Sequence, residues 1–259
     1  MSTWKLGVQL WTLRSEMDKS IENTLQKAAE QGFQGVEFSH VTYDGVPAAK
    51  IRAMLADFGL APIARHLGSY GAITDQLDRE IEFSKELGCP YVVFSLMEQW
   101  RRDTESAWAQ SMEDLARAGE RCAEQGIGLC YHNHDFELRE QIGGCPSLDV
   151  LLDTISSDYV KAELDAGWIH YGGYDPACYI RKYAGRVQMV HLKDVAVQPD
   201  GSALTVELGK GEVNLTKVAA AASEAGAEWL IYEQDYTQNP PFQAMETSMD
   251  WIRRNILQR

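Results

Sequence analysis

Six ionisable side chains stand at the ends of apolar, strand-like runs, and their types suit metal-ion and acid–base chemistry. They are Glu37, His66, His132, Asp165, His191 and Glu233. A buried cluster of carboxylates and imidazoles is unfavourable unless a cation neutralises it. A bound divalent cation can activate carbonyl and hydroxyl oxygens, and a carboxylate beside it can remove a proton. These residue types therefore indicate a metal-assisted reaction on an oxygen-rich small molecule.

The six side chains can meet only if the runs that carry them form neighbouring parallel strands. The chain repeats a short apolar run followed by a longer segment with helical periodicity, which is typical of βα units around a parallel sheet. Eight strands are predicted: Leu6–Trp11, Gly35–Phe38, Ala61–His66, Tyr91–Leu96, Ile127–His132, Val160–Asp165, Val187–Leu192 and Trp229–Glu233. The run at 91–94 lacks polar alternation, as expected of a strand covered on both faces.

The segments between these runs carry helical signals. One apolar stripe near the end of the chain has helical spacing: Met245, Met249, Ile252 and Ile256. Glycines follow five helical segments, where a left-handed C′ residue is favoured: Gly32, Gly59, Gly88, Gly126 and Gly226. Eight βα units close more naturally into a barrel than into an open sheet, and no G-x-G-x-x-G follows the first strand. We therefore predict the α/β class, with a single (β/α)8 TIM barrel domain over residues 1–259.

Two connections are longer than a minimal βα unit requires. Asp194 to Val213 contains the turn Pro199-Asp200-Gly201 and predicts a hairpin or a lid. Phe136 to Pro146 predicts a second long loop. Both follow strands, so in a barrel both would lie on the catalytic face.

Three of the six side chains follow three consecutive predicted strands. Asp165, His191 and Glu233 come after the sixth, seventh and eighth strands, whose carboxyl ends open on one face of a barrel. Each residue alone is as easily a buried, hydrogen-bonded polar group. Together they supply an O, N, O set that suits Mn²⁺, Mg²⁺, Co²⁺ or Zn²⁺ and leaves positions open for substrate oxygens. The constellation predicts one divalent ion.

Six sequence segments spread over nearly the whole chain resemble a known family: Gly7–Thr12, Gly35–Phe38, Tyr131–Glu137, Glu163–Trp168, His191–Asp194 and Tyr232–Asp235. The family is that of sugar phosphate isomerases and epimerases with a xylose-isomerase-like barrel. The segments at 131–137 and 191–194 are the most specific. The resemblance implies one divalent metal held by a Glu, an Asp, a His and a second Glu, and we expect that metal to be Mn²⁺ before Mg²⁺, Co²⁺ or Zn²⁺. The resemblance places the last three on Asp165, His191 and Glu233.

The fifth strand departs from the family pattern. Where the family's epimerases have a glutamate that is both ligand and acid/base, this chain has His132. Either His132 binds the metal, or Glu137 reaches back from the loop to do so. Asn133 and His134 would orient a ligand, and His134 is also a candidate for binding substrate.

Epimerisation and aldose–ketose isomerisation both begin with removal of a proton next to a carbonyl, which a metal assists by stabilising the enediolate. Glu233 is the expected base as well as a ligand, with Glu37 and His66 facing it from the opposite rim. The main prediction is therefore a metal-dependent isomerase or epimerase of a sugar or sugar derivative. An epimerase needs an acid/base group on each face of the reacting carbon. If His132 replaces the usual Glu, one member of that pair of carboxylates is missing. The alternative is a metal-dependent dehydratase or lyase on a keto-sugar, keto-inositol or keto-glycoside.

Several further residues are candidates for contacting a small carbohydrate substrate. Lys193 could hold an oxyanion or a phosphate, and Trp11 and Trp168 could stack on the apolar face of a sugar. Each has an ordinary structural interpretation as well, a surface lysine or a packing aromatic.

Composition restricts the class of protein. A net charge of −14 with 24 Lys and Arg disfavours nucleic acid as a partner. It therefore also disfavours the function of the abasic-site endonucleases, which belong to the same superfamily. No signal peptide or membrane span is evident, which predicts a cytoplasmic protein. The five scattered cysteines predict neither disulfides nor a zinc knuckle. A non-catalytic sugar-binding scaffold is a weaker alternative, and the sequence leaves a homo-oligomer open.

Overall fold

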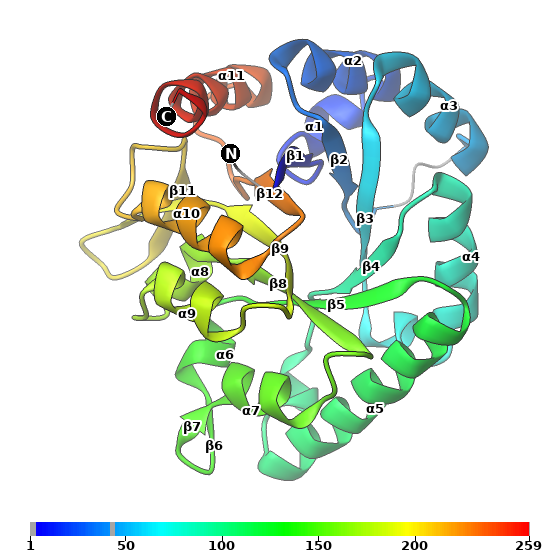
Figure 1. Ribbon diagram of the computed structural model, residues 1–259, viewed down its shortest axis with the longest axis vertical. Helices are drawn as coiled ribbons and strands as arrows, with labels where there is room; N and C mark the ends of the chain where they lie inside the picture. Colours follow the sequence, from blue (N-terminus) through cyan, green and yellow to red (C-terminus); the bar gives the residue numbers. More distant parts are fainter. Residues whose placement is uncertain (1–3, 42–44, 259) are drawn as a thin grey trace.

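The structure is a computed structural model that describes residues 4–41 and 45–258. Eight parallel strands form its barrel: β1 Lys5–Gln9, β2 Gly35–Phe38, β3 Ala61–Leu67, β4 Tyr91–Phe94, β5 Gly128–His132, β8 Val160–Asp165, β9 Val187–Leu192 and β12 Trp229–Tyr232. Within the described residues they pair in this order and β12 closes on β1, and helices surround them as an outer ring (Figure 1). The predicted single TIM barrel domain is confirmed, while residues 1–3, 42–44 and 259 of its predicted extent lie outside the described residues.

The predicted strands agree with the observed ones to within two residues at either end. β2, β8 and β9 have the predicted bounds. The first strand ends earlier than predicted because the chain turns after Gln9, where the amide of Thr12 donates to the Gln9 carbonyl at 3.2 Å. The residues after Gln9 still have apolar, strand-like character, but their backbone groups no longer pair with the neighbouring strands.

Eleven α-helices connect the strands within the described residues: α1 Arg14–Met17, α2 Ile21–Gln31, α3 Ala48–Phe58, α4 Leu77–Leu87, α5 Glu105–Glu124, α6 Phe136–Arg139, α7 Ser147–Thr154, α8 Ala166–Tyr171, α9 Pro176–Lys182, α10 Leu215–Ala225 and α11 Pro241–Ile252. Short 3-10 turns lie at Tyr70–Ala72 and Gln99–Arg101, and a π turn lies at Arg253–Leu257. Gly32, Gly59, Gly88 and Gly226 cap helices in the left-handed region, as predicted. None of the described helices is long and apolar enough to cross a bilayer.

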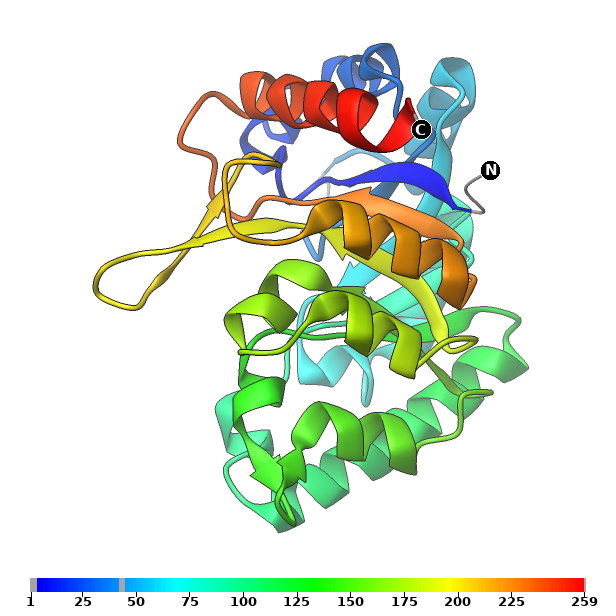
Figure 2. The ribbon, with the colours of Figure 1, turned by 60° about the vertical axis from the view of Figure 1, so that its left-hand side comes forward.

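Both long connections contain further structure. Strands β10 (Asp194–Val197) and β11 (Ala203–Val206) form an antiparallel hairpin, which extends away from the barrel (Figure 2). This confirms the predicted hairpin, while a lid function stays a prediction. The segment at 136–146 is more ordered than a plain loop, because it contains α6 and the two-residue pairing of β6 (Gln141–Ile142) with β7 (Cys145–Pro146).

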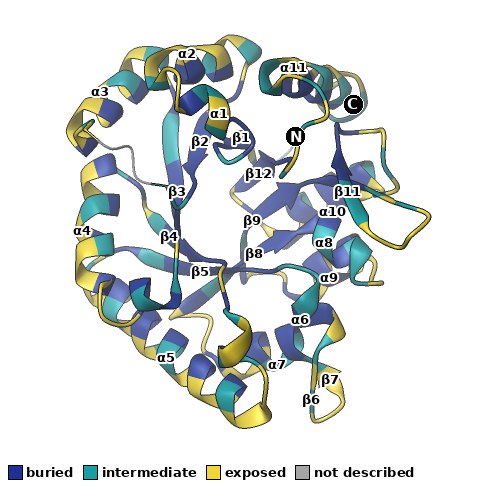
Figure 3. Ribbon diagram, turned by 180° about the vertical axis from the view of Figure 1, so that it is seen from behind, coloured by how far each residue is buried: buried dark blue, intermediate teal, exposed yellow. Residues whose placement is uncertain are grey.

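Two apolar cores stabilise the barrel. The larger lies between the strands and the buried faces of the helices, whose exposed residues face outward (Figure 3). The smaller fills the interior of the barrel: Ile63, Ala64, Val93, Cys130, Met189, Trp229 and Ile231. All five cysteines are free, and Cys145 and Cys178 are exposed. Because the lower interior is filled by apolar side chains, a polar site has room only at the carboxyl ends of the strands.

Candidate active site

Side chains inside the barrel change from apolar to polar within two residues along a strand. On β5, Cys130 of the inner core is followed by His132, and on β9, Met189 is followed by His191. Alternate residues of a strand point to the same side, so each pair faces the interior. The polar layer thus lies at the carboxyl ends of the strands, where the sequence placed it.

Four predicted metal ligands meet from four consecutive staves of the barrel. His132, Asp165, His191 and Glu233 are buried, and each offers a ligand atom within 4.8 Å of the others. Ligands bonded to one ion at about 2.1 Å stand about 3–4 Å apart, so small inward movements would be sufficient. Two carboxylates and two imidazoles suit Mn²⁺, Co²⁺ or Zn²⁺. The residues present therefore fit a single divalent ion.

Each of the two imidazoles directs its second nitrogen at a deeper carboxylate. The Nδ1 of His191 lies 2.7 Å from Glu233 Oε2, and its Nε2 lies 2.7 Å from Glu37 Oε2. The Nδ1 of His132 lies 2.9 Å from Glu163 Oε2, which leaves its Nε2 for a metal. A carboxylate behind a metal-bound imidazole fixes the tautomer and the ring orientation. Glu37 and Glu163 are placed for this supporting role.

A second buried group has the same spacing: His66, His132, Glu163 and His191. It shares both imidazoles with the first group. Glu163 does not line the cavity at the strand ends, whereas Glu233 does. His66 and His132 of this second group also line it, so access is common to both groups. The first group is distinguished by its second carboxylate, which favours Mn²⁺.

A cavity of about 150 Å³ lies at the carboxyl ends of the strands. Its lining within the described residues is Gln9, Trp11, Ser39, His40, His66, Ser95, Leu96, His132, His134, Glu233 and Asp235. Trp11 and His134, both predicted to contact substrate, are among them. Trp168 is not, although its ring centroid lies 5.9 Å from that of His134. Trp168 therefore supports a lining residue instead of forming the wall itself.

The two groups predicted to act from the opposite rim occupy different depths. His66 lines the cavity, and its Nδ1 lies 3.2 Å from the hydroxyl of Ser95. Glu37 is fully buried, accepts a hydrogen bond of 2.7 Å from Gln9 Nε2 and does not line the cavity. His66 can thus meet a substrate. Glu37 lies behind His191 and is not placed to act as a base.

Glu137, the alternative ligand from the loop after the fifth strand, belongs to neither group among the described residues. Its carboxylate accepts hydrogen bonds from the Tyr131 hydroxyl and the His134 amide, both at 2.8 Å. Burial raises its pKa to about 7, against the effect of these hydrogen bonds. The structure brings His132, not Glu137, to the other candidate ligands.

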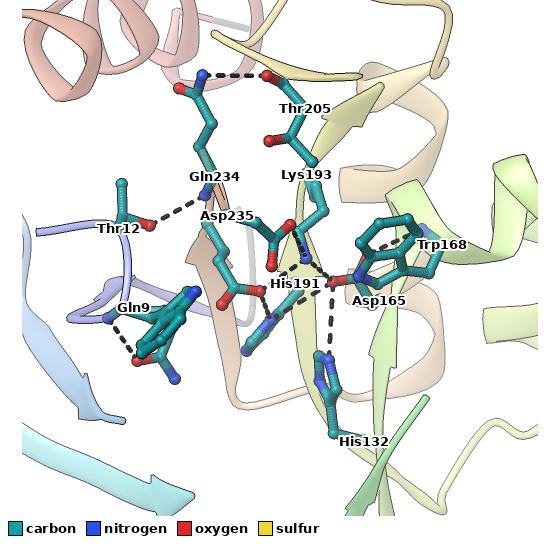
Figure 4. A network of polar contacts seen from close by, with 12 residues as sticks. Gln9, Thr12, His132, Asp165, Trp168, His191, Lys193, Thr205, Gln234 and Asp235 are labelled. Atoms are coloured by element: carbon teal, nitrogen blue, oxygen red, sulfur yellow. Dashed lines mark hydrogen bonds and ion pairs between the residues drawn. The ribbon is translucent and has the colours of Figure 1, made fainter. Parts of the chain in front are cut away.

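Lys193 contacts three carboxylates and does not line the cavity. Its fully buried Nζ lies 2.8 Å from Asp165 Oδ2 and 2.8 Å from Asp235 Oδ2 (Figure 4). The Nζ lies 2.9 Å from Glu233 Oε2. It also lies 4.9 Å from the ring centroid of Trp168. The expectation of direct contact with a substrate oxyanion is not supported by this position, because the ammonium group is already surrounded by protein charges.

The charges of the polar layer depend on one another. Burial opposes the charged form of His191, yet Glu163 and Glu233 raise its pKa well above the usual range. Burial and the neighbouring His191 hold the pKa of His132 well below its usual range. Burial opposes charge on Glu233 too, but Lys193 and His191 lower its pKa. The layer therefore keeps Glu233 ionised and His132 neutral, the forms in which they can bind metal, whereas His191 would release a proton when it binds.

Sequence reasoning missed three residues that matter for this site. Glu163 stands two residues before Asp165 on the same strand face, and this i, i+2 spacing was a usable signal. Asp235 stands two residues after Glu233 and lines the cavity, although it follows the strand. Ser39 also lines the cavity, and nothing in its sequence context distinguishes it from a surface serine.

Comparison with known proteins identifies the family. A family model described as "Xylose isomerase-like TIM barrel" matches residues 25–255. The chain belongs to this family. The resemblance seen in the sequence segments is thereby confirmed, and members of such a family include enzymes that act on carbohydrates.

Individual relatives differ in the reaction that they are named for. An inosose dehydratase from Geobacillus kaustophilus (strain HTA426) is 28% identical over 67% of this chain, and the match covers 62% of that relative, less than two thirds of its length. An inosose dehydratase from Clostridium perfringens (strain 13 / Type A) is 26% identical over 75% of this chain and 72% of the relative. The crystal structure of a sugar phosphate isomerase/epimerase from Parabacteroides distasonis ATCC 8503 has a TM-score of 0.84 and 20% identity, covering 98% of this chain and all of the other. This structural likeness shows the shared fold.

Proposed function

We propose that this protein is a divalent-metal-dependent dehydratase that acts on a cyclic polyhydroxy ketone, such as a keto-inositol or a keto-sugar. The observation that carries the proposal is the one-sided placement of carboxylates. Within the described residues, the carboxylates that line the cavity are Glu233 and Asp235, both at the end of β12. On the fifth strand, where the family's epimerases have a second glutamate, His132 lies instead. The names of the two dehydratase relatives support the same reaction class.

β-Elimination needs one base and one acid, and the site can supply both. Glu233 is ionised and lines the cavity, so it can take the proton from the carbon next to the carbonyl. The electron pair of that C–H bond forms a carbon–carbon double bond, and the C–O bond of the β-hydroxyl breaks. His66 also lines the cavity, and in this proposal it gives a proton to the departing hydroxide. One molecule of water leaves. In a polyhydroxy ketone the carbon that lost the proton carries a hydroxyl, so the product is an enol; the β-carbon takes the proton from Glu233 and the enol hydroxyl returns a proton to His66, which gives a second ketone.

The candidate ligands His132, Asp165, His191 and Glu233 would hold the metal ion. A bound divalent ion would supply electrostatic stabilisation of the negative charge that develops on the carbonyl oxygen. Lys193 keeps Asp165 and Glu233 charged and fixed. Glu37 orients the imidazole of His191, and Glu163 orients that of His132.

An isomerase or epimerase is the second candidate, and one observation favours it. His66 on β3 reaches the cavity from a different wall than Glu233. If it returned a proton to the opposite face of the same carbon, the product would be an epimer instead of a dehydrated ketone. The two reactions share their first step and differ in whether the β-hydroxyl leaves.

The decisive experiment is a panel of keto-inositols, ketoses and keto-glycosides incubated with Mn²⁺ in deuterated water. We expect a product lighter by one water, detected by mass spectrometry, from a cyclic polyhydroxy ketone. Deuterium incorporation without loss of water would support the epimerase instead. Glu233→Gln should abolish either product, and Glu246→Gln, on the exposed face of α11, should leave the rate unchanged. An unaltered rate in Glu233→Gln would contradict both assignments.

A further inference from the structure

The lining of the cavity is acidic, although the protein shares its fold with sugar phosphate enzymes. Glu233 and Asp235 line it, and within the described ranges no lysine or arginine does. Residues 42–44, which the structure does not describe, are Thr, Tyr and Asp, so they add no cationic side chain. A phosphate group is normally bound by arginine, lysine or backbone amides at a helix N-terminus.

Lys193 and Arg14, which contact residues of the cavity lining, already have partners. Lys193 is surrounded by Asp165, Glu233 and Asp235. Arg14, in the segment after β1, donates to the carbonyl oxygen of Trp11 at 2.7 Å and lies over the Trp11 ring at 4.3 Å. Neither side chain is directed at a ligand.

The charge balance around the candidate metal group also disfavours an anionic ligand. Five carboxylates gather there: Glu37, Glu163, Asp165, Glu233 and Asp235. The groups that can balance them are the ammonium group of Lys193 and the imidazole of His66, whose Nε2 lies 3.0 Å from Glu163 Oε2. With the ligating imidazoles neutral, a divalent ion would leave no positive excess to attract a phosphate.

Asp235 is the carboxylate of the cavity that the metal does not need. It belongs to neither candidate metal group in the described part of the chain. Its Oδ2 lies 2.8 Å from Lys193 Nζ, and its side chain keeps 17% of its surface exposed. A carboxylate held in this way can accept hydrogen bonds from hydroxyl groups without changing its own position.

The backbone on both sides of Asp235 is fixed. The amide of Gln234 donates to Thr12 Oγ1 at 2.9 Å, and the amide of Tyr236 donates to Thr205 Oγ1 at 3.1 Å. The side chain of Gln234 extends to the hairpin strand that carries Thr205, as Figure 4 shows. A residue anchored at both neighbours is a preorganised contact and not a mobile loop side chain.

Two other polar atoms face this cavity without a protein partner. The hydroxyl of Ser39 and the Nδ1 of His134 are buried and have no hydrogen-bond partner among the described residues. Both are neutral groups that suit hydroxyl or carbonyl oxygens. The lining thus offers one fixed acceptor and two neutral partners.

We infer that Asp235, held by Lys193, binds substrate hydroxyls and makes the cavity select an unphosphorylated polyhydroxy ketone over its phosphorylated counterpart. This inference rests on the function proposed above and specifies its substrate class. Asp235 contacts the substrate, whereas Lys193 acts through Asp235 as a positioning residue.

Binding can be measured without turnover, which separates this inference from the proposed reaction. The Mn²⁺-loaded protein would be titrated calorimetrically with myo-inositol and with myo-inositol monophosphate, neither of which has the carbonyl group that the reaction needs. We expect the neutral polyol to bind at least about tenfold more tightly than the phosphate. Asp235→Asn should weaken binding of the neutral polyol about 10- to 100-fold, which is the range for loss of a hydrogen bond to a charged group, and should compress the ratio between the ligands.

One further variant separates the effect of charge from that of geometry, and a second serves as the control. Asp235→Glu keeps the charge and moves it by one methylene, so it should weaken polyol binding but retain discrimination against the phosphate. Asp158→Asn removes one exposed negative charge before β8, at the other end of the barrel, and should change neither affinity.

Equal or tighter binding of the phosphate by the unmodified protein would overturn the inference, as would an unchanged ratio in Asp235→Asn. Loss of discrimination in Asp235→Glu would show that charge is not its cause. Failure of the proposed function is a different result, namely no product from any ketone while polyol binding persists.

Discussion

The lower and upper layers inside the barrel lie on the same strands, but different interactions stabilise them. The lower layer is apolar and includes Val93, Cys130 and Met189. Two residues further along, the upper layer contains His132 and His191, whose contacts are with carboxylates. The lower layer is stabilised by removal of apolar surface from water. The upper layer depends on balanced charges, so its composition follows chemistry and not packing.

Glu163 is where the two layers interpenetrate. It stands on β8 two residues before Asp165, at a depth where β9 has Met189 as its partner in register. Its carboxylate lies 3.0 Å from His66 Nε2 and 2.9 Å from His132 Nδ1. A charged group at this depth is tolerated because several imidazoles surround it. The polar site therefore extends one layer deeper on the side of the barrel that holds the candidate ligands.

The largest effect is expected from Glu233→Gln in the upper layer. Loss of the base should lower the rate about 10²- to 10⁴-fold, and the variant should still fold because it is isosteric. Steady-state kinetics and thermal unfolding measured on the same preparation test this. A large loss of stability with the rate retained would mean that Glu233 belongs to the scaffold.

Met189→Ala tests the lower layer. Met189 is fully buried inside the barrel, so truncation should reduce the free energy of unfolding by about 2–5 kcal/mol. Metal binding, measured at a temperature where the variant is folded, should persist. Leu257→Ala, at a residue that is 49% exposed, provides the control. Loss of metal binding in folded Met189→Ala would show that the layers are coupled.

Metal removal acts on the upper layer, where the candidate ligands lie. Chelation should abolish activity and lower stability by about 2.7–4.1 kcal/mol if the ion was present at 100 to 1,000 times its Kd. Calorimetry before and after chelation, followed by addition of Mn²⁺, measures this change. An unchanged melting temperature together with full activity would contradict the metal assignment.

The smallest effect is expected from Glu163→Gln, which sharpens the boundary between the layers. The amide can still accept from His132 Nδ1, but it no longer increases the basicity of the imidazole. We expect metal affinity to fall about 10- to 100-fold, with Glu37→Gln producing a similar loss through His191. Metal titration reports the change, and identical affinities in both variants and the parent protein would remove the supporting role.

Much of this arrangement was predictable from local patterns. The strand runs, the glycines after the helices and the hairpin turn at 199–201 led to the observed barrel, because each reflects short-range periodicity or backbone preference. The positions of Asp165, His191 and Glu233 at consecutive strand ends predicted their convergence. The roles of Lys193 and Glu37 were harder to predict, since each depends on which partners fill the space around it.

The sequence by itself determined the eight-unit barrel and the residue types at its carboxyl ends, because alternation and strand order follow from the chain alone. Only the tertiary structure decided which nitrogen of each imidazole faces the candidate metal group. It also decided that Lys193 is enclosed by Asp165, Glu233 and Asp235. These contacts join residues up to 42 positions apart. They form only as the closure and stagger of the strands allow, and no local pattern encodes that stagger.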